Sequence, residues 1–210
     1  MKISKEDYRN NPCRASSLPY WKTVRISVPK NMVILHDSDF CEGCFEDYVD
    51  EPYFRLYHNL QEVRTASLPA GFGICNAAPS EYAAHINRCY ADASVTETEI
   101  ESYVQHSVYA PELWIAIQEL KTEKTAATGI AEFDAQIGEG ILEWIQVSPE
   151  YRGFGLGTYV VTELLYRMAA QKARFATVSG RVNNPSKPEY LYRKCGFQGN
   201  DVWHILSKKQ

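Results

Sequence analysis

The segment "VSPEYRGFGLGTYVV", residues 147–161, combines three closely spaced glycines with the start of a helical pattern. Gly153, Gly155 and Gly157 alternate along the chain, and from Val160 onward apolar residues recur at the spacing of one helix face. Glycine lets a ligand approach the backbone without a Cβ in the way. The first amides of a helix attract anions, phosphates above all. The segment therefore predicts a loop that holds a phosphate group over a helix N-terminus.

Two common phosphate-binding motifs do not fit this loop. A Walker P-loop requires a lysine after its last glycine, and here Thr158 follows Gly157. The dinucleotide fingerprint Gly-x-Gly-x-x-Gly would need a third glycine at Thr158 or Val160. The residues instead form Arg-x-x-Gly-x-Gly, from Arg152 to Gly157. Before it, "GILEWIQV" at 140–147 predicts a buried strand, because β-branched and aromatic residues are frequent there.

The order of strand, Arg-x-x-Gly-x-Gly loop and helix resembles the acetyl-CoA-binding motif of the GNAT superfamily of N-acetyltransferases. The resemblance implies acetyl-CoA as cosubstrate, with its pyrophosphate on the backbone amides of the loop. The implied coenzyme contacts come from the strand end, the loop and the helix start, and are Ile145, Gln146, Val147, Arg152, Gly153, Phe154, Gly155, Leu156, Gly157 and Thr158. A structural turn without a ligand is the alternative interpretation of the loop taken alone.

The composition is typical of a globular protein with one well-buried core. The chain has 210 residues, 45% of them hydrophobic, and a formal net charge of −4. No apolar run reaches the roughly 18 residues needed to span a membrane. The first residues, "MKISKEDYRNNPCR", lack an apolar signal core. We therefore expect a cytoplasmic protein with neither a membrane nor nucleic acid among its partners.

The six cysteines are expected to be reduced thiols, because no secretory signal is recognisable. Cys41 and Cys44 form one Cys-x-x-Cys pair. A zinc site would need a second pair or nearby histidines, and Cys13 and Cys75 do not have that spacing. We expect no bound metal, and a metal or redox role of the pair is the alternative.

Residues 71–210 are predicted to form one α/β domain whose element order also matches the GNAT fold. The resemblance implies a mixed, mostly antiparallel sheet with a splayed parallel strand pair, flanked by helices. The predicted strands lie at 72–77, 113–120, 127–136, 140–147, 175–182 and 202–208. The predicted helices lie at 80–90, 96–106 and 188–195, with a long helix after the glycines.

Residues 1–70 have no counterpart in a minimal GNAT domain and are predicted to form an N-terminal α/β extension. Residues 22–28 and 31–37 predict two strands joined by a tight turn, and 44–63 is expected to contain helix. Such a segment is small for an independent domain. We expect it to pack on residues 71–210, where it would complete the substrate cleft or an oligomer contact, so a homodimer is left open.

Glu143 is the candidate general base of the predicted reaction. Strand alternation places it on one face with Ile141, Ile145 and Val147, where a carboxylate is costly unless it is paired or used. The segment from Leu142 to Gly157 is similar to that of the spermidine/spermine acetyltransferases, which implies a glutamate that deprotonates the amine, commonly through water. A carboxylate paired with a buried arginine or tyrosine is the alternative, and Glu132 and Asp134 are weaker candidates.

Tyr192 is the candidate general acid. It stands in "LYRKCGF", residues 191–197, which resembles the Leu-Tyr-x-x-x-Gly-Phe motif of the family. The resemblance implies a phenol that protonates the departing thiolate, and a tyrosine packed in the core is the alternative. It also implies an asparagine seven residues earlier. Because Pro185 occupies that position, Asn184 is the preferred coenzyme contact and Asn183 the alternative.

The expected function is the transfer of an acetyl group from acetyl-CoA to a primary amine by direct attack. The acceptor is a small molecule or a peptide, and the sequence does not say which. A non-catalytic acyl-CoA sensor is the alternative, although it would have no need for the glutamate and the tyrosine. The remaining histidines and tryptophans are expected to be structural, namely His85, His106, His204, Trp114, Trp144 and Trp203.

Overall fold

The computed structural model describes residues 3–91 and 93–209. The chain divides into two compact units. One comprises residues 59–176, and the other comprises residues 1–58 together with 177–210. The C-terminal segment therefore belongs with the N-terminal residues.

The unit of residues 59–176 contains most of the elements that the sequence predicts. Its strands are β3 (Phe72–Cys75), β4 (Trp114–Glu119), β5 (Thr125–Asp134) and β6 (Glu139–Val147), and β7 (Phe175–Arg181) begins in it. Its helices are α4 (Pro79–Cys89), α5 (Glu97–Tyr103) and α6 (Leu156–Ala170), with short 3₁₀ turns η3 (Pro111–Leu113) and η4 (Pro149–Tyr151). All these predicted strands and helices are confirmed, although α5 ends earlier than expected.

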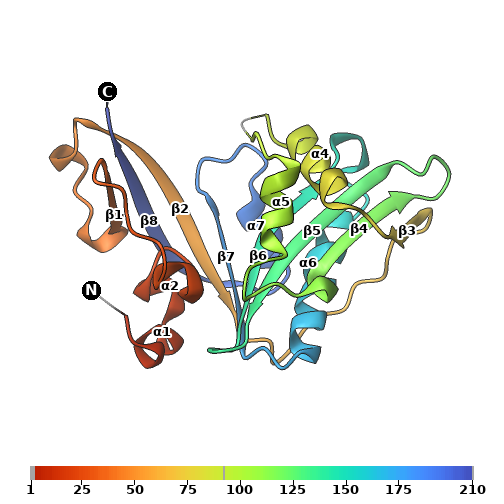
Figure 1. The fold of residues 1–210 in the computed structure, drawn as a ribbon, viewed down its shortest axis with the longest axis horizontal. Coiled ribbons are helices and arrows are strands. Elements are labelled where there is room, and N and C mark those ends of the chain that lie inside the picture. The colour runs from red at the N-terminus through yellow and green to blue at the C-terminus, as the bar shows by residue number, and fades with distance from the viewer. Residues whose placement is uncertain (1–2, 92, 210) are drawn as a thin grey trace. The chain divides into compact units, whose positions relative to one another are not determined.

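Strands β3 to β6 form an antiparallel meander, with helices on both of its faces. The pairs β3–β4, β4–β5 and β5–β6 are all antiparallel. In Figure 1, α4 and α5 lie in front of these strands and α6 lies behind them. Gly140 of β6 makes the approach of α6 possible, because a Cβ there would collide with the Met168 side chain.

Local sequence signals fix the starts of the two front helices. Helix α4 begins with Pro79, and the Glu81 side chain accepts a hydrogen bond of 2.7 Å from the Ala78 amide. Helix α5 begins with the capping box Thr96-x-x-Glu99, in which each side chain accepts from the other residue's amide. The hydrogen bonds from Thr96 lower the pKa of Glu99.

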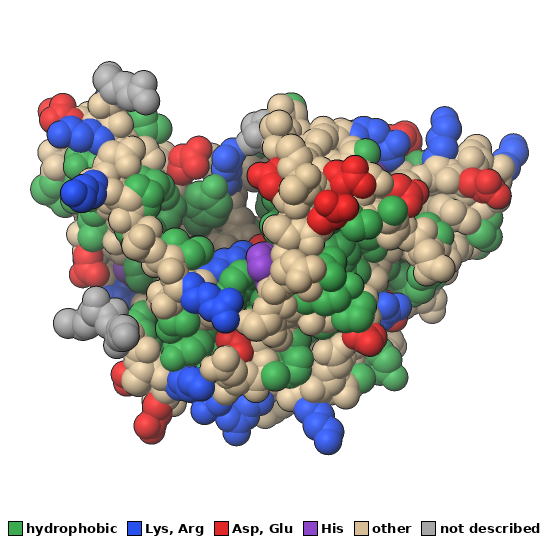
Figure 2. Space-filling model, in the orientation of Figure 1, with side chains coloured by type: hydrophobic (Ala, Val, Ile, Leu, Met, Phe, Trp, Pro, Cys, Tyr) green, Lys and Arg blue, Asp and Glu red, His purple; other side chains and the backbone are tan. Residues whose placement is uncertain are grey.

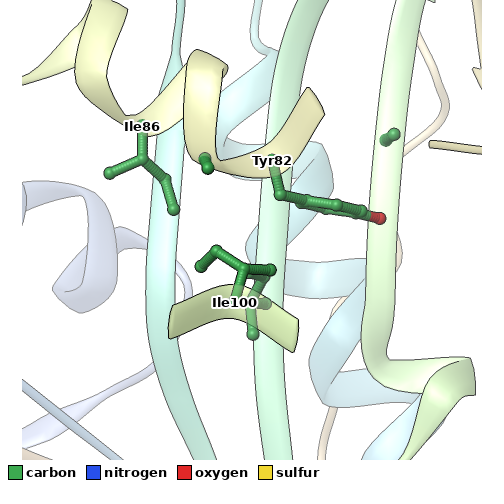
Figure 3. Packing of buried hydrophobic residues seen from close by; sticks show 6 residues of the cluster. Tyr82, Ile86 and Ile100 are labelled. Atoms are coloured by element: carbon green, nitrogen blue, oxygen red, sulfur yellow. The ribbon is translucent and has the colours of Figure 1, made fainter. Parts of the chain in front are cut away.

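A compact apolar cluster holds α4 and α5 on the sheet (Figure 3). It joins Tyr82 and Ile86 of α4 to Ile100 of α5 and Ile130 of β5. Ile86, Ile100 and Ile130 are fully buried. Burying an isoleucine side chain contributes about 1.5–3 kcal/mol. This cluster therefore positions the front helices against β5 and β6.

The other unit contains α1 (Lys5–Asn10), α2 (Pro12–Ala15), α3 (Tyr20–Thr23), β1 (Met32–His36), η1 (Asp37–Asp39), η2 (Glu42–Cys44) and β2 (Tyr48–His58). It also contains α7 (Pro188–Lys194), β8 (Gln198–Lys208) and most of β7. β8 lies between β1 and β2 and is antiparallel to both. The predicted domain boundary between residues 70 and 71 stays a prediction. β8 belongs to the predicted domain of residues 71–210, but it pairs with β1 and β2 of the predicted extension.

Two predictions for the N-terminal segment are wrong. Residues 22–28, expected as a strand, form the end of α3 and the irregular chain after it, and Val24, Ile26 and Val28 are about half exposed. Residues 48–58, expected to include helix, form strand β2. Their tyrosines, phenylalanine and valine favour a strand, and Pro52 disfavours a helix interior. The strand predicted at 31–37 is confirmed as β1.

Arg55 ties the N-terminal helices to β2. Its guanidinium, 1% exposed, donates hydrogen bonds to the Tyr8 hydroxyl at 2.7 Å, the Ser17 carbonyl at 3.3 Å and Ser179 Oγ at 3.1 Å. A buried charge needs such partners to offset its lost hydration. The contacts hold α1 and the following loop in one place.

In the unit of residues 59–176 the strands follow the order β6-β5-β4-β3, and in the other unit they follow the order β1-β8-β2. β7 is the parallel neighbour of β6, to which α6 connects it, whereas the other described pairings are antiparallel. This confirms the predicted α/β fold with a mixed, mostly antiparallel sheet, one parallel pair and flanking helices.

Candidate active site

The glycine loop, residues 152–157, has the backbone geometry expected of an anion-binding turn. Gly153 and Gly155 have φ values of +88° and +86°, in the left-handed region that favours glycine. Gly155 is the N-cap of α6, and no side chain caps the helix. The first amides of α6 therefore lack a side-chain acceptor. A Cβ added at Gly153 or Gly155 would meet no atom within 4 Å, so the space over the loop is open.

Aromatic contacts hold the glycine loop against β3. Phe154, 58% exposed, packs edge-on against Phe72, and Phe72 packs against Tyr151, each pair with 5.7 Å between ring centroids. The Tyr151 hydroxyl donates to Glu119 at 3.1 Å. Hydrogen bonds from Thr122 and then Tyr151 lower the pKa of Glu119. The glycine loop is thus fixed to β3 by the packing of these aromatic rings.

The remaining predicted coenzyme contacts of this unit range from buried to exposed. Ile145 and Gln146 are buried and Val147 is half-buried. Arg152, Gly153, Phe154 and Gly155 are exposed, Leu156 is buried, and Gly157 and Thr158 are partly buried. The exposed loop residues are the ones that a ligand can reach without a change in the protein.

A buried hydrogen-bond network supports the end of β6 from the α4 side. His85 is 3% exposed, and its ring nitrogens lie 2.8 Å from Thr128 Oγ1 and 2.9 Å from Ser148 Oγ. Arg88 donates to the same Ser148 Oγ at 2.5 Å, and Gln146 donates to Thr128. Burial, and then the charge of Arg88, lower the pKa of His85 to about 4. His85 is therefore neutral near pH 7 and acts as a structural tether, as predicted.

A β-bulge in β6 places Glu143 outside the regular pairing. Trp144 pairs with Ile130 and Leu142 pairs with Ala131, so two steps on β6 match one on β5, and Glu143 is the extra residue. The contacts of β6 with α6 support the bulge, because Gly140 and Ile145 both face α6. In a regular strand, residues five positions apart face opposite sides of the sheet.

The bulge corrects the predicted face of the strand. Ile141, Glu143, Ile145 and Val147 were expected to share one side, but the extra residue breaks the alternation between Ile141 and Ile145. Glu143 itself is half-buried and has interaction partners. Bulges next to active sites re-aim side chains, and this one lies at the candidate base.

An aromatic cluster, Tyr90, Tyr103, Trp144 and His106, covers this part of β6 on the α5 side. Tyr90 packs on Trp144 with 5.9 Å between centroids, and its hydroxyl donates to the Ile145 carbonyl at 2.8 Å. The Trp144 indole donates to the Tyr103 hydroxyl at 3.2 Å, and Tyr103 stacks on His106 at 5.2 Å. The residue beside Glu143 is therefore fixed from both front helices.

One carboxylate contacts the aromatic cluster, and others are exposed on α5. His106 Nδ1 lies 3.3 Å from Oε1 of Glu132, which is 2% exposed. Figure 2 shows acidic side chains gathered over α5, where Glu97, Glu99 and Glu101 are exposed. Such a concentration of negative charge attracts cations to this face.

Tyr192 and Asn184 belong to the other unit. Tyr192 is 7% exposed and packs against Phe54 and Phe197, at 6.2 and 5.8 Å between centroids. This packing agrees with the alternative of a tyrosine in the core, and the role of general acid stays a prediction. Asn184 is partly buried, and its Oδ1 accepts from the amide and hydroxyl of Ser186 at 2.9 and 2.7 Å.

Gly196, in the motif of Tyr192, is required by the local geometry. Its φ is +99°, and a Cβ there would lie 2.8 Å from Nε2 of His58. His58 is 4% exposed and packs on Phe197, and burial lowers its pKa. The glycine thus allows α7 to turn directly into β8 over a buried imidazole.

The Cys-x-x-Cys pair is exposed and reduced. A hydrogen bond with Cys41 raises the pKa of Cys44. Within residues 3–91 and 93–209, no three or more His, Cys, Asp or Glu side chains are grouped so that they could hold a metal ion. In the same part of the chain, no helix has the length and apolarity that crossing a bilayer requires.

Residues 110–199 match a family model described as "Acetyltransferase (GNAT) domain". The fold is similar to a GCN5-related N-acetyltransferase from Sphaerobacter thermophilus, with 18% identity and a TM-score of 0.65 over 77% of this chain and 52% of that one. It is similar to a Drosophila protein, with 16% identity and a TM-score of 0.64 over 90% and 65%. Ard1 from Thermoplasma volcanium matches with 13% identity and a TM-score of 0.54 over 67% and 99%.

The family model thus matches 90 of the 210 residues of this chain. The likeness to the solved structures concerns the fold, and the chain spans 52% and 65% of the first two of them. No curated protein matches. The domain match covers the bulge, the glycine loop, α6, α7 and Tyr192. GNAT acetyltransferases are typically acetyl-CoA-dependent, which agrees with the open glycine loop.

Sequence reasoning missed the pairing of His106 with Glu132 and the bulge at Glu143. Both residues of the pair were considered separately, one as a structural histidine and one as a weaker base. A signal did exist, since a carboxylate in the middle of a buried strand needs a partner. The partner's identity depends on how α5 packs on β5.

Proposed function

We propose that this chain is an N-acetyltransferase that moves the acetyl group of acetyl-CoA to a primary amine of a small molecule or peptide. The observation that carries the proposal is the uncapped start of α6 behind two left-handed glycines, within the matched GNAT domain. Residues Arg152 to Thr158 would hold the pyrophosphate, and the end of β6 would lie along the rest of the coenzyme. The acidic and aromatic surface beside Glu143 suits a cationic acceptor.

The reaction has to remove a proton from the acceptor before attack. An alkylamine with a reference pKa near 10.4 is mostly protonated at pH 7. We assign Glu143 as the base that accepts this proton, directly or through a water molecule. The amine nitrogen then attacks the thioester carbonyl carbon, the C–N bond forms and the C–S bond breaks. We assign Tyr192 as the acid that protonates the departing thiolate.

The first test is release of free thiol from acetyl-CoA in the presence of butylamine, phenethylamine, lysine or a peptide with a free N-terminus. Amine-dependent release supports the enzyme. Tight acetyl-CoA binding without release from any amine would favour the acyl-CoA sensor instead. A calorimetric titration with acetyl-CoA, run beside the activity assay, separates the two.

Two variants test the assigned residues. Glu143→Gln should lower kcat/KM by about 10²- to 10⁴-fold at pH 7 and by less at high pH, where free amine is abundant. Tyr192→Phe should lower kcat to a similar extent and leave the affinity for acetyl-CoA nearly unchanged. Glu163→Gln, at a half-buried ion pair with Arg167 on α6, and Tyr190→Phe, two residues from Tyr192 and 76% exposed, are the matched controls. Near-normal turnover in either test variant, correctly folded, would remove its assignment.

A further inference from the structure

His106 and Glu132 form a pair of one half-exposed and one buried side chain. The His106 side chain is 28% exposed and the Glu132 side chain 2%, and 3.3 Å separates Nδ1 from Oε1. Glu132 lies on β5, and His106 follows α5. The buried carboxylate thus holds an imidazole that reaches solvent.

The pairing determines which imidazole nitrogen can accept a proton. A carboxylate accepts a hydrogen bond, so it selects the tautomer with the proton on Nδ1. The lone pair of the neutral ring then lies on Nε2. Once Nε2 gains a proton, the same carboxylate stabilises the resulting imidazolium. A buried carboxylate behind an imidazole is an arrangement suited to proton transfer.

The pair lies beside the bulge that carries Glu143. Glu132 pairs with Ile141 and the preceding Ala131 pairs with Leu142, so Glu132 lies next to the bulged step that carries Glu143. His106 stacks on Tyr103, whose hydroxyl accepts from Trp144, the residue after Glu143. The titratable groups that contact His106 include Tyr103 from α5 and Glu132 from β5, and Glu143 of β6 is next to Trp144.

We propose that His106 is a proton-relay residue of the acetyl transfer and that Glu132 is its positioning residue, an inference that rests on the proposed function. The acceptor ammonium gives one proton to Glu143, and a water passes it to Nε2 of His106. The imidazolium releases that proton to solvent, and the Glu143 carboxylate is restored. After C–N bond formation and C–S bond cleavage, Tyr192 gives its proton to the thiolate, and the second amine proton restores the tyrosine.

The chemistry favours this direction of transfer. In model peptides an imidazole is a stronger base than a carboxylate by about two pKa units. A proton taken up by a glutamate is therefore captured by a nearby imidazole, which prevents its return to the amine. The half-exposed position of His106 provides the exit to water.

The test uses His106→Ala, with the amine that gives the fastest thiol release from the wild-type protein. We expect kcat/KM at pH 7 to fall by about 10²-fold, and added imidazole to restore part of it. The affinity for acetyl-CoA and the melting temperature should stay close to wild type. Glu132→Gln should also lower kcat/KM at pH 7 and should shift the pH–rate profile. His36→Ala is the matched control, because His36 also pairs with a carboxylate, Asp201 at 3.0 Å, in the other unit.

Several results would overturn the relay. One is a His106→Ala protein whose kcat/KM stays within about twofold of wild type from pH 6 to 9. Another is a loss of activity that imidazole does not restore and that a lower melting temperature accompanies. If His106→Ala does not fold, the pH–rate profile of His106→Gln decides in its place, and an unchanged profile refutes the relay. A wild-type protein that releases no thiol with any amine refutes the proposed function, and the relay falls with it.

Discussion

Replacing Gly155 by alanine should have two separable effects, of which the first is on stability. The φ of Gly155 is +86°, and an L-residue in the left-handed region costs roughly 1–2 kcal/mol. No atom lies within 4 Å of the added Cβ, so no steric clash inside the protein increases this value. In a protein of this size each kcal/mol lowers the melting temperature by about 2–4 °C. We therefore expect Gly155→Ala to melt about 2–8 °C below wild type.

The second effect is on coenzyme affinity. The added methyl group stands at the start of α6, where the pyrophosphate is proposed to contact backbone amides. A misplaced loop or a displaced phosphate should raise the Kd for acetyl-CoA at least about tenfold, which corresponds to about 1.4 kcal/mol. Isothermal titration calorimetry with acetyl-CoA measures this directly and needs no acceptor amine.

Gly71 provides a control for backbone strain alone. Its φ is +88°, and a Cβ there also meets no atom within 4 Å, but it precedes β3 and lies outside the glycine loop. Gly71→Ala should therefore lose a similar amount of thermal stability and bind acetyl-CoA as tightly as wild type. If Gly155→Ala shows the same pattern as Gly71→Ala, the placement of the pyrophosphate is refuted. If neither variant melts earlier, the strain argument is wrong.

Two further predictions concern stability. Folding lowers the pKa of His85 from its usual 6.5 to about 4. Between these two pH values the unfolded chain binds a proton at His85 and the folded protein does not. The free energy of unfolding therefore falls by roughly 3 kcal/mol as the pH drops through this range. Urea denaturation at pH 7 and pH 4.5 should show a smaller loss for His85→Gln than for wild type, and equal losses would contradict the assignment. A fragment of residues 71–210 should not fold cooperatively, because β8 would lack both of its neighbours, β1 and β2. A stable fragment with a sharp thermal transition would show that the N-terminal residues are dispensable.

Sequence reasoning succeeded where the signal is local. The glycine loop, the capping box at Thr96 and the apolar periodicity of α6 each fit within a few residues and need no distant partner. Residues 24–28 show the limit of the approach. Their alternating apolar side chains look like a strand, but a strand exists only where another strand pairs with it, and here β8 pairs with β1 and β2 instead.

In the candidate active site, too, local features could be predicted from the sequence and features that depend on distant residues could not. The identities of Glu143 and Tyr192 follow from motifs, whereas the bulge at Glu143 does not, because register is a property of two strands together. The contact of His106 with Glu132 depends on tertiary packing, since 26 residues separate them and the cluster around Ile100 brings α5 onto β5. These features can be found only once the helices and strands are placed.

The position of β8 has a consequence for how the protein is made. Met32 pairs with Ser207, and Val49 pairs with the same residue from the other side. During synthesis from the N-terminus, β1 and β2 therefore leave the ribosome long before the strand that joins them. Residues 59–176 form a unit that is continuous in sequence and can fold in the meantime. β1 and β2 have unpaired edges until β8 has been synthesised. Their pairing with β8 is therefore a slow step of biosynthesis, and the one most exposed to aggregation.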